Sequence, residues 1–295
     1  MKHPIILPLL LGASLDTGHA DIIAHYNMEQ TGSPLVDKVG GQQAVATGSG
    51  DAYGLPGPTG FYNAVDRTAD GSWQLSAADS AELRSLSNNI TVAAWINLEP
   101  GRHGKSSNYD QIIGDDSAWN GNGWNFGVVS GPSLLKFTKN GVADIYSPAI
   151  TVVPGTWYHV AVTVANTGCT FYLNGTELGP AAGNTDNMIT TGSDPYAIGR
   201  SNGGGQEMWF PGSLDEVRAY DTVLTQTEIA DLMVAPLPGD PKLFAPSACS
   251  RRPGECRARL PAASRELPAI DGQFVYGQQH GPYSAPGRAR TRPHV

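Results

Sequence analysis

Short runs of alternating apolar and polar residues, separated by Gly, Asn, Asp and Ser, fill the chain between residues 21 and 235. A period of two is the pattern of a β-strand with one buried face. About 215 residues rich in such runs favour a single all-β domain of two packed sheets. The expected strands cover residues 21–28, 90–98, 109–115, 124–130, 134–139, 157–165, 169–175, 196–200 and 213–220.

Turn and cap signals mark two hairpins and one helix. Residues 166–168 link two expected strands, and Asn174-Gly175 tolerates the positive φ of a tight turn. Thr225 is a good N-cap, and Glu228 three residues later completes a capping box. We therefore expect one short helix near the C-terminal end of the domain.

The two ends of the chain differ from this body. Residues 1–20 carry Lys2, an apolar run and small residues, which predicts a signal peptide cleaved after Ala20. No segment reaches the roughly 20 apolar residues that a membrane helix needs. Residues 236–295 hold 10 prolines and no sustained periodicity, which predicts a disordered tail. We expect a domain of residues 21–235 that is secreted, released and free of a membrane span.

Charge narrows the class of partner. Residues 21–235 hold 9 Lys and Arg against 22 Asp and Glu, a net charge of −13. Binding to nucleic acid needs clustered Lys and Arg to neutralise phosphates, so we expect no nucleic-acid partner. A neutral ligand or a bound cation is compatible with this charge.

The three cysteines form no disulfide framework. Cys249 and Cys256 are close enough in sequence to form a bridge, which leaves Cys169 over. We expect Cys169 to be a small buried residue of a strand.

Two segments, "TWYHVAVTVANTGCTFYLNG" and "FPGSLDEVRAY", are the least generic parts of the chain. With the strand order around them, residues 21–235 resemble laminin-G-like jellyroll domains of the concanavalin A-like lectin and glucanase superfamily, in the kind found in exported bacterial proteins. The resemblance implies a jellyroll sandwich of two curved antiparallel sheets that meets ligands on its concave face or on rim loops. It also implies that the strand carrying Asp215 lies near the N-terminal strand. Lectins, adhesion domains and glycosidases share this fold, so it does not fix a function.

Asp215 and Glu216 raise the question of catalysis. A retaining glycosidase needs two carboxylates about 5 to 5.5 Å apart, whereas adjacent residues of a strand point to opposite faces. Glucanases of the superfamily place acids at alternate positions, and no Glu-x-Asp-x-Glu run occurs here. We therefore expect no enzyme. Leu214 and Val217 both look like core residues, and their spacing predicts a bulge between them.

Two roles stay open for the carboxylates at this bulge. Calcium takes six to eight oxygens from carboxylates and backbone carbonyls, and the resemblance implies structural calcium near the joined ends of the domain. Asp215, with Glu29 or Asp37, would supply the carboxylates. The alternative is a network of salt bridges and hydrogen bonds without metal, in which Arg218 takes part.

The most ligand-like stretches are residues 108–127 and 201–212. Aromatic faces stack on the C–H patches of sugars, while amides and carboxylates bind hydroxyls. Packing is an equal explanation for Trp119 and Trp209, and the better one for Trp124. The candidate ligand residues are Tyr109, Asp115, Asp116, Trp119, Asn122 and Trp209.

These features predict a secreted, non-catalytic module that binds carbohydrate outside a bacterial cell or in the periplasm, with calcium as a candidate structural ion. The competing hypothesis is an extracellular adhesion or structural domain that binds another protein. A glycoside hydrolase ranks third because no pair of facing carboxylates is evident.

Overall fold

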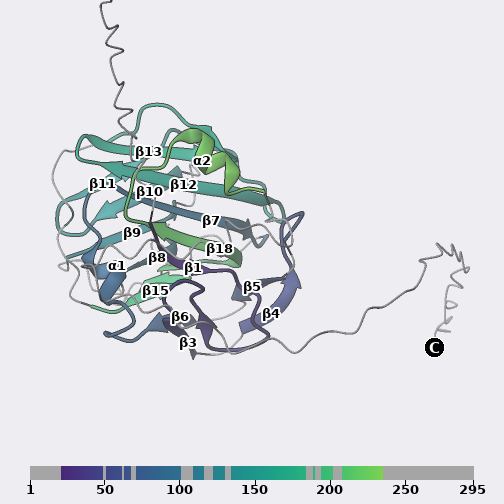
Figure 1. Ribbon diagram of the computed structural model, residues 1–295. Helices are drawn as coiled ribbons and strands as arrows, with labels where there is room; N and C mark the ends of the chain where they lie inside the picture. Colours follow the sequence, from purple (N-terminus) through teal and green to yellow (C-terminus); the bar gives the residue numbers. More distant parts are fainter. Residues whose placement is uncertain are drawn as a thin grey trace, which may run out of the picture. The chain divides into compact units, whose positions relative to one another are not determined.

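Two antiparallel β-sheets, called sheet A and sheet B, make up most of the computed structural model (Figure 1). The structure describes residues 21–48, 51–61, 63–67, 71–100, 109–115, 122–129, 134–183, 189, 194–201 and 208–234. The predicted signal peptide and the predicted tail lie outside these residues. Within them, the all-β two-sheet architecture expected from the sequence is confirmed.

Sheet A combines strands from both ends and the middle of the chain. Seven of its described strands follow one another in the order β14 (Thr176–Glu177), β13 (Gly168–Leu173), β12 (Trp157–Ala165), β7 (Ile90–Leu98), β18 (Gly212–Tyr220), β5 (Asn63–Arg67) and β4 (Asp51–Pro56). The eighth, β1 (Ile22–Tyr26), also pairs with β18. The expected neighbourhood of the N-terminal strand and the strand carrying Asp215 is therefore confirmed.

Sheet B is built mainly from the middle of the chain. Its eight described strands follow the order β11 (Ala143–Tyr146), β10 (Leu134–Lys139), β9 (Trp124–Val129), β8 (Tyr109–Asp115), β15 (Tyr196–Ile198), β6 (Gly71–Leu75), β3 (Gln43–Gly48) and β2 (Leu35–Val36). A small hairpin of β16 (Arg200–Ser201) and β17 (Met208–Trp209) lies next to β8.

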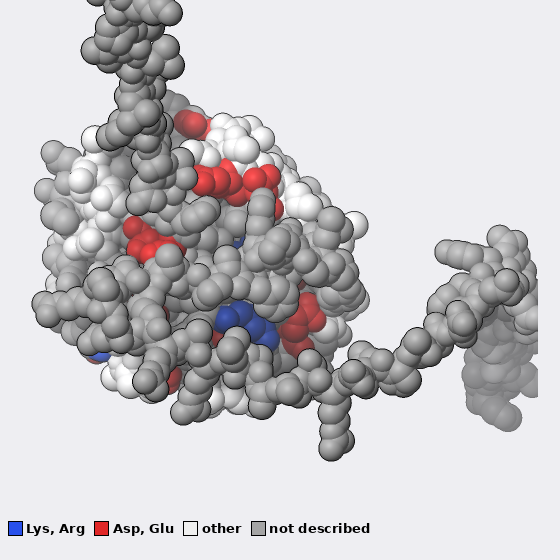
Figure 2. All heavy atoms as spheres, in the orientation of Figure 1, with Lys and Arg blue, Asp and Glu red and all other residues white. Residues whose placement is uncertain are grey.

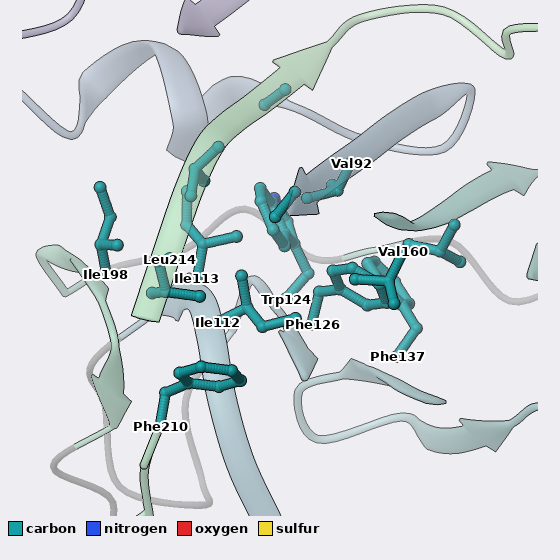
Figure 3. Close-up of a cluster of buried hydrophobic side chains, with 14 of the residues drawn as sticks. Val92, Ile112, Ile113, Trp124, Phe126, Phe137, Val160, Ile198, Phe210 and Leu214 are labelled. Carbon is teal, nitrogen blue, oxygen red and sulfur yellow. The ribbon is translucent and has the colours of Figure 1, made fainter. Parts of the chain in front are cut away.

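The core fills the space between the two sheets. Figure 3 shows Val92, Val160 and Leu214 of sheet A together with Phe126 and Phe137 of sheet B. All five side chains are almost completely buried. Each buried aliphatic or aromatic side chain of this kind contributes roughly 1.5 to 3 kcal/mol to folding. We call the surface of each sheet that faces away from this core its outer face.

Trp124 and Cys169 belong to the same core. Trp124 is fully buried and stacks on Phe137 with ring centroids 6.0 Å apart. Packing, the better of its two explanations, is therefore its role. Cys169 is buried in β13, as expected for a small strand residue.

Two short helices accompany the described sheets. The helix α2 (Gln226–Asp231) begins at Thr225, whose hydroxyl accepts from the backbone N–H of Glu228, as the capping box predicts. Ile229 packs this helix on the outer face of sheet A (Figure 1). The helix α1 (Ala81–Ser85) was not predicted from the sequence. In the described part of the chain, no helix has the length and apolar character needed to cross a membrane.

The predicted hairpin at Asn174-Gly175 is confirmed. Both residues have positive φ, 48° and 73°, and they connect β13 to β14. The Asn174 side chain accepts a hydrogen bond from the His159 backbone N–H at 2.9 Å, which ties the turn to β12.

Candidate functional site

A polar pocket of about 210 Å³ opens on the outer face of sheet B. Side chains alternate along β9 and β10, so Phe126 and Phe137 enter the core while Asn125, Lys136 and Thr138 face outward. We call this space the β8–β11 pocket. Its lining residues are Tyr109, Asn125, Lys136, Thr138, Lys139, Asn140, Gly141, Val142, Ala143, Asp144 and Met208.

Lys136 makes three contacts at the pocket through its ammonium group. Its ammonium group lies 2.9 Å from a carboxylate oxygen of Asp144. The same group lies 4.7 Å from the ring centre of Tyr109 and 5.8 Å from that of Tyr146. These distances suit cation–π contacts, so one cation is fixed by a carboxylate and two rings.

The register of β10 and β11 brings these groups together. Lys136 lies directly opposite Tyr146, and Thr138 directly opposite Asp144. The Thr138 hydroxyl donates to Asp144 at 2.8 Å, and the Tyr146 hydroxyl donates to it at 3.2 Å. Cross-strand pairs of this kind stabilise a sheet. Here they also fix the position of the single exposed carboxylate among the lining residues.

Two buried polar atoms of the pocket lack a hydrogen-bond partner within the described residues. They are the Tyr109 hydroxyl and Oδ1 of Asn125. The Asn125 amide N–H donates to Oδ1 of Asn140 at 2.8 Å, so only its oxygen is left over. Burial raises the pKa of Tyr109 well above its ordinary value, so the hydroxyl keeps its proton. Buried polar groups are normally paired, so these two atoms are exceptions, and Oδ1 of Asn125 lies against Gly114 of β8.

The β16–β17 hairpin borders the pocket. Met208 lines it directly, whereas Trp209 lies near the guanidinium of Arg200, whose carbon is 6.0 Å from the ring centre. The side-chain amide of Gln111 on β8 donates to the carbonyl of Arg200 at 2.8 Å. This bond holds the hairpin against β8.

The predicted ligand residues have different positions. Tyr109 lines the pocket, and the exposed Asn122 borders it through its carbonyl, which accepts from Asn140 at 3.3 Å. Asp115 is fully buried at the end of β8, opposite Tyr196, and does not line the pocket. Trp209 is half-buried beside the pocket. Asp116 and Trp119 lie outside the described residues.

Most of the pocket was not predicted from the sequence, because its residues lie on strands and the predicted ligand residues lie mainly in or next to loops. Lys136, Thr138 and Asp144 lie on strands, and their polar side chains alternate with core residues. A usable signal was present in Asn140-Gly141, a dipeptide typical of tight hairpins. It places β10 beside β11 and so pairs these side chains.

A second polar cluster lies on the outer face of sheet A, at the predicted bulge of β18. Pairing with β7 shifts between Asp215 and Arg218, and Glu216 has a positive φ of 51°. Leu214 and Val217 both enter the core, as predicted. Because of this extra residue, Asp215 and Glu216 lie on the same face. The expectation that adjacent residues of this strand point to opposite faces was wrong for Asp215 and Glu216, because a bulge interrupts the alternation there.

Glu216 joins the first and last strands of sheet A. Its carboxylate accepts from Nε2 of His25 on β1 at 2.7 Å and from the guanidinium of Arg218. Burial alone would raise the pKa of Glu216, but Arg218 and His25 outweigh burial and lower it. Burial and the nearby Arg218 lower the pKa of His25, so its imidazole is neutral at pH 7. Glu216 is therefore a carboxylate held by one cation and one neutral donor.

Asp215 has the opposite character. It is fully buried, and burial together with the Glu216 charge raises its pKa to about 9. One carboxyl oxygen accepts from the Glu216 backbone N–H at 2.8 Å. The other oxygen has no hydrogen-bond partner among the described residues. In the fold, Asp215 is therefore a neutral carboxylic acid at pH 7.

The candidate calcium ligands Glu29 and Asp37 have hydrogen-bond partners in the described part of the chain, and the Glu29 charge also helps to raise the pKa of Asp215. Glu29 accepts from the side-chain amide of Asn63 at 2.7 Å, and Asp37 accepts from the backbone N–H groups of His25 and Gly40. Among the described residues, no three His, Cys, Asp or Glu side chains gather closely enough to hold a metal ion. Calcium binding therefore stays a prediction, and Glu216 with His25 and Arg218 forms a network of the kind expected as the alternative.

Comparison with known proteins places the fold. A family model described as the concanavalin A-like lectin/glucanases superfamily matches residues 68–230, more than half of the chain. Among solved structures, domain 4 of AbnA, a GH43 extracellular arabinanase from Geobacillus stearothermophilus in complex with arabinotriose, is 21% identical. That match covers 72% of this chain and 98% of the other, with a TM-score of 0.55.

Two further matches are weaker. Trypanosoma rangeli sialidase is 15% identical over 72% of this chain and 32% of its own, with a TM-score of 0.48. The binding domain of botulinum neurotoxin DC, in complex with rat synaptotagmin II, is 17% identical over 72% and 50%, with a TM-score of 0.47. No curated protein matches the chain. At 21% identity, the match to domain 4 of AbnA supports the fold alone.

Proposed function

We propose that this chain, which belongs to the concanavalin A-like lectin/glucanases superfamily, is a secreted non-catalytic module that binds carbohydrate in the β8–β11 pocket. The observation that carries the proposal is a pocket lined by polar side chains of neighbouring strands beside the ring of Tyr109. The ammonium of Lys136, the hydroxyl of Thr138 and the carboxylate of Asp144 lie together on the outer face of sheet B. Sugars present C–H patches and hydroxyls to such groups.

The dimensions of the pocket suit one sugar ring. Its volume of about 210 Å³ is below the range typical of sites for drug-sized ligands. A longer glycan would place one residue in the pocket and extend across the outer face of sheet B. Domain 4 of AbnA was solved with arabinotriose, which makes that trisaccharide a natural first probe.

The test is calorimetric titration of the purified chain with arabinotriose, cellotriose and mannotriose. The Thr138→Val variant keeps the shape of the side chain and removes its hydroxyl, so we expect binding to weaken by about tenfold. Thr170→Val is the matched control, because Thr170 is also half-buried but belongs to β13 of sheet A. A folded protein that binds none of these sugars, or equal losses in both variants, would contradict the proposal. Binding of an extracellular protein would then be the better hypothesis.

Calcium binding stays a prediction and can be tested separately. Calcium is titrated into chelator-treated protein while Tm is followed, because a ligand that binds only the folded state raises Tm. We expect a rise in Tm, with Asp215 and Glu29 or Asp37 as carboxylate ligands and backbone carbonyls as the others. An unchanged Tm would contradict calcium binding.

A further inference from the structure

We propose that Asp144 makes the β8–β11 pocket selective for neutral sugars over acidic ones. This inference rests on the proposed function, because it concerns which carbohydrates the same pocket accepts. It begins from the state of Lys136, the cation that an acidic sugar would need. That cation already has a carboxylate partner at 2.9 Å.

Three charged residues line the pocket, and only two face it. Lys139 is fully buried and shares the inward face of β10 with Leu135 and Phe137, both of which enter the core. Lys136 and Asp144 remain on the outer face, with side-chain exposures of 12% and 38%. The charges presented to a ligand are therefore one positive and one negative, in contact with each other.

An acidic sugar would meet repulsion in this arrangement. A uronate carboxylate close enough to pair with Lys136 would also approach Asp144, because these two residues share one contact. The uronate carboxylate and the Asp144 carboxylate would repel each other at this short distance, and more strongly where water is partly excluded. The acidic body adds a weaker, salt-screened repulsion. Figure 2 shows several patches of Asp and Glu on the side of sheet A, the face away from the pocket.

A neutral sugar can use the same groups without that cost. An ammonium group has three N–H donors, so Lys136 keeps donors for ligand hydroxyls after pairing with Asp144. Asp144 can accept from a ligand hydroxyl, as it already does from Thr138 and Tyr146. The two charged groups that face the pocket can thus be matched by hydroxyls alone.

The test compares neutral and acidic trisaccharides on the full chain by titration calorimetry at low ionic strength. Arabinotriose, cellotriose and mannotriose are the neutral probes, and trigalacturonate and triguluronate the acidic ones. We expect the wild type to bind its best neutral probe at least about tenfold more tightly than either acidic probe. The Asp144→Asn variant, which keeps an acceptor oxygen for Thr138, should narrow this ratio by about tenfold through a gain in acidic binding.

Two further variants separate the explanations. Glu177→Gln, at an exposed position on β14 of sheet A, changes the net charge equally and should leave the ratio unchanged. Lys136→Met leaves Asp144 uncompensated and should widen the ratio, which provides a test even if Asp144→Asn fails to fold. A wild type that prefers acidic probes, or a ratio unmoved by Asp144→Asn, would overturn this inference while carbohydrate binding stands. Binding of no probe would overturn both.

Discussion

Asp215 and Glu216 are adjacent carboxyl groups whose pKa values shift in opposite directions. Burial and the Glu216 charge raise the pKa of Asp215 to about 9. Burial also acts on Glu216, but Arg218 and His25 outweigh it and lower its pKa. The bulge explains why both groups lie on one face of the sheet, and their different partners explain the opposite shifts.

The raised pKa of Asp215 predicts how the stability of the fold changes with pH. Its ordinary pKa is 3.8, so between about pH 4 and 9 the folded chain binds one more proton than the unfolded chain. Folding is therefore weakened by this group as pH rises through that window. The Asp215→Asn variant, uncharged in both states, should be more stable than the wild type at pH 7 by roughly 1 to 3 kcal/mol.

Urea unfolding at pH 3.5, 5, 7 and 8.5 measures this difference. The gain should be absent at pH 3.5, where both states of the wild type are protonated, and should grow up to pH 8.5. Comparing variant with wild type at each pH cancels the titration of other groups. A variant that is less stable at pH 7, or a gain that does not depend on pH, would rule out a neutral Asp215.

At the scale of single elements, the helix cap offers the most direct check on sequence reasoning. Thr225 and Glu228 form both bonds of the capping box in α2. Removing the hydroxyl with Thr225→Ala should lower the free energy of unfolding by about 1 kcal/mol. Thr225→Ser keeps the hydroxyl and is the matched control. Equal Tm values for the Ala and Ser variants would mean that the cap contributes nothing measurable.

Elements with local signals were predicted well from the sequence. The cap at Thr225, the turn at Asn174-Gly175 and the bulge after Leu214 each depend on residues within a few positions of one another. The helix α1 escaped prediction because five residues carry too little periodicity to be recognised. Signals from residues close in sequence therefore suffice to predict these features.

The candidate site was only partly predictable, because its residues are far apart in the sequence and meet only in the folded chain. Tyr109 on β8 and Lys136 on β10 meet because β9 lies between the two strands and the registers place both side chains on one outer face. Met208 reaches the pocket from a hairpin about 70 residues beyond Lys136 in the sequence. Aromatic and polar residues in a loop gave a composition typical of sugar sites, but composition does not specify register.

At the scale of the whole molecule, the described sheets bring distant strands together. In sheet B, β8 lies beside β15, and β15 lies beside β6, although long stretches of chain separate all three. Alternation along a strand predicts its buried face but not its neighbours. Only the family resemblance implied which strands are neighbours, namely the N-terminal strand and the strand carrying Asp215. The structure pairs these two strands, and the family match to residues 68–230 supports the resemblance.

A buried charged contact joins β18 to β1 in sheet A. Glu216 on β18 holds His25 on β1, and Arg218 beside it is only 7% exposed. Glu216→Gln would leave a buried guanidinium without its carboxylate, which typically costs roughly 3 to 5 kcal/mol. The double variant Glu216→Gln/Arg218→Met removes both charges and should recover part of that loss.

The pH dependence of this loss identifies its cause. Because the folded pKa of Glu216 is lowered from 4.5, its contribution is present above about pH 4.5 and disappears as pH falls through the folded pKa. The gap between wild type and Glu216→Gln should therefore be full at pH 7 and shrink in acid. Hydrogen exchange should also show faster exchange of the β1 amides in the variant, because β1 pairs with β18 beside Glu216. If the loss of stability is equal at all pH values and β1 exchange is unchanged, packing and not the charges stabilises the pairing of β1 with β18.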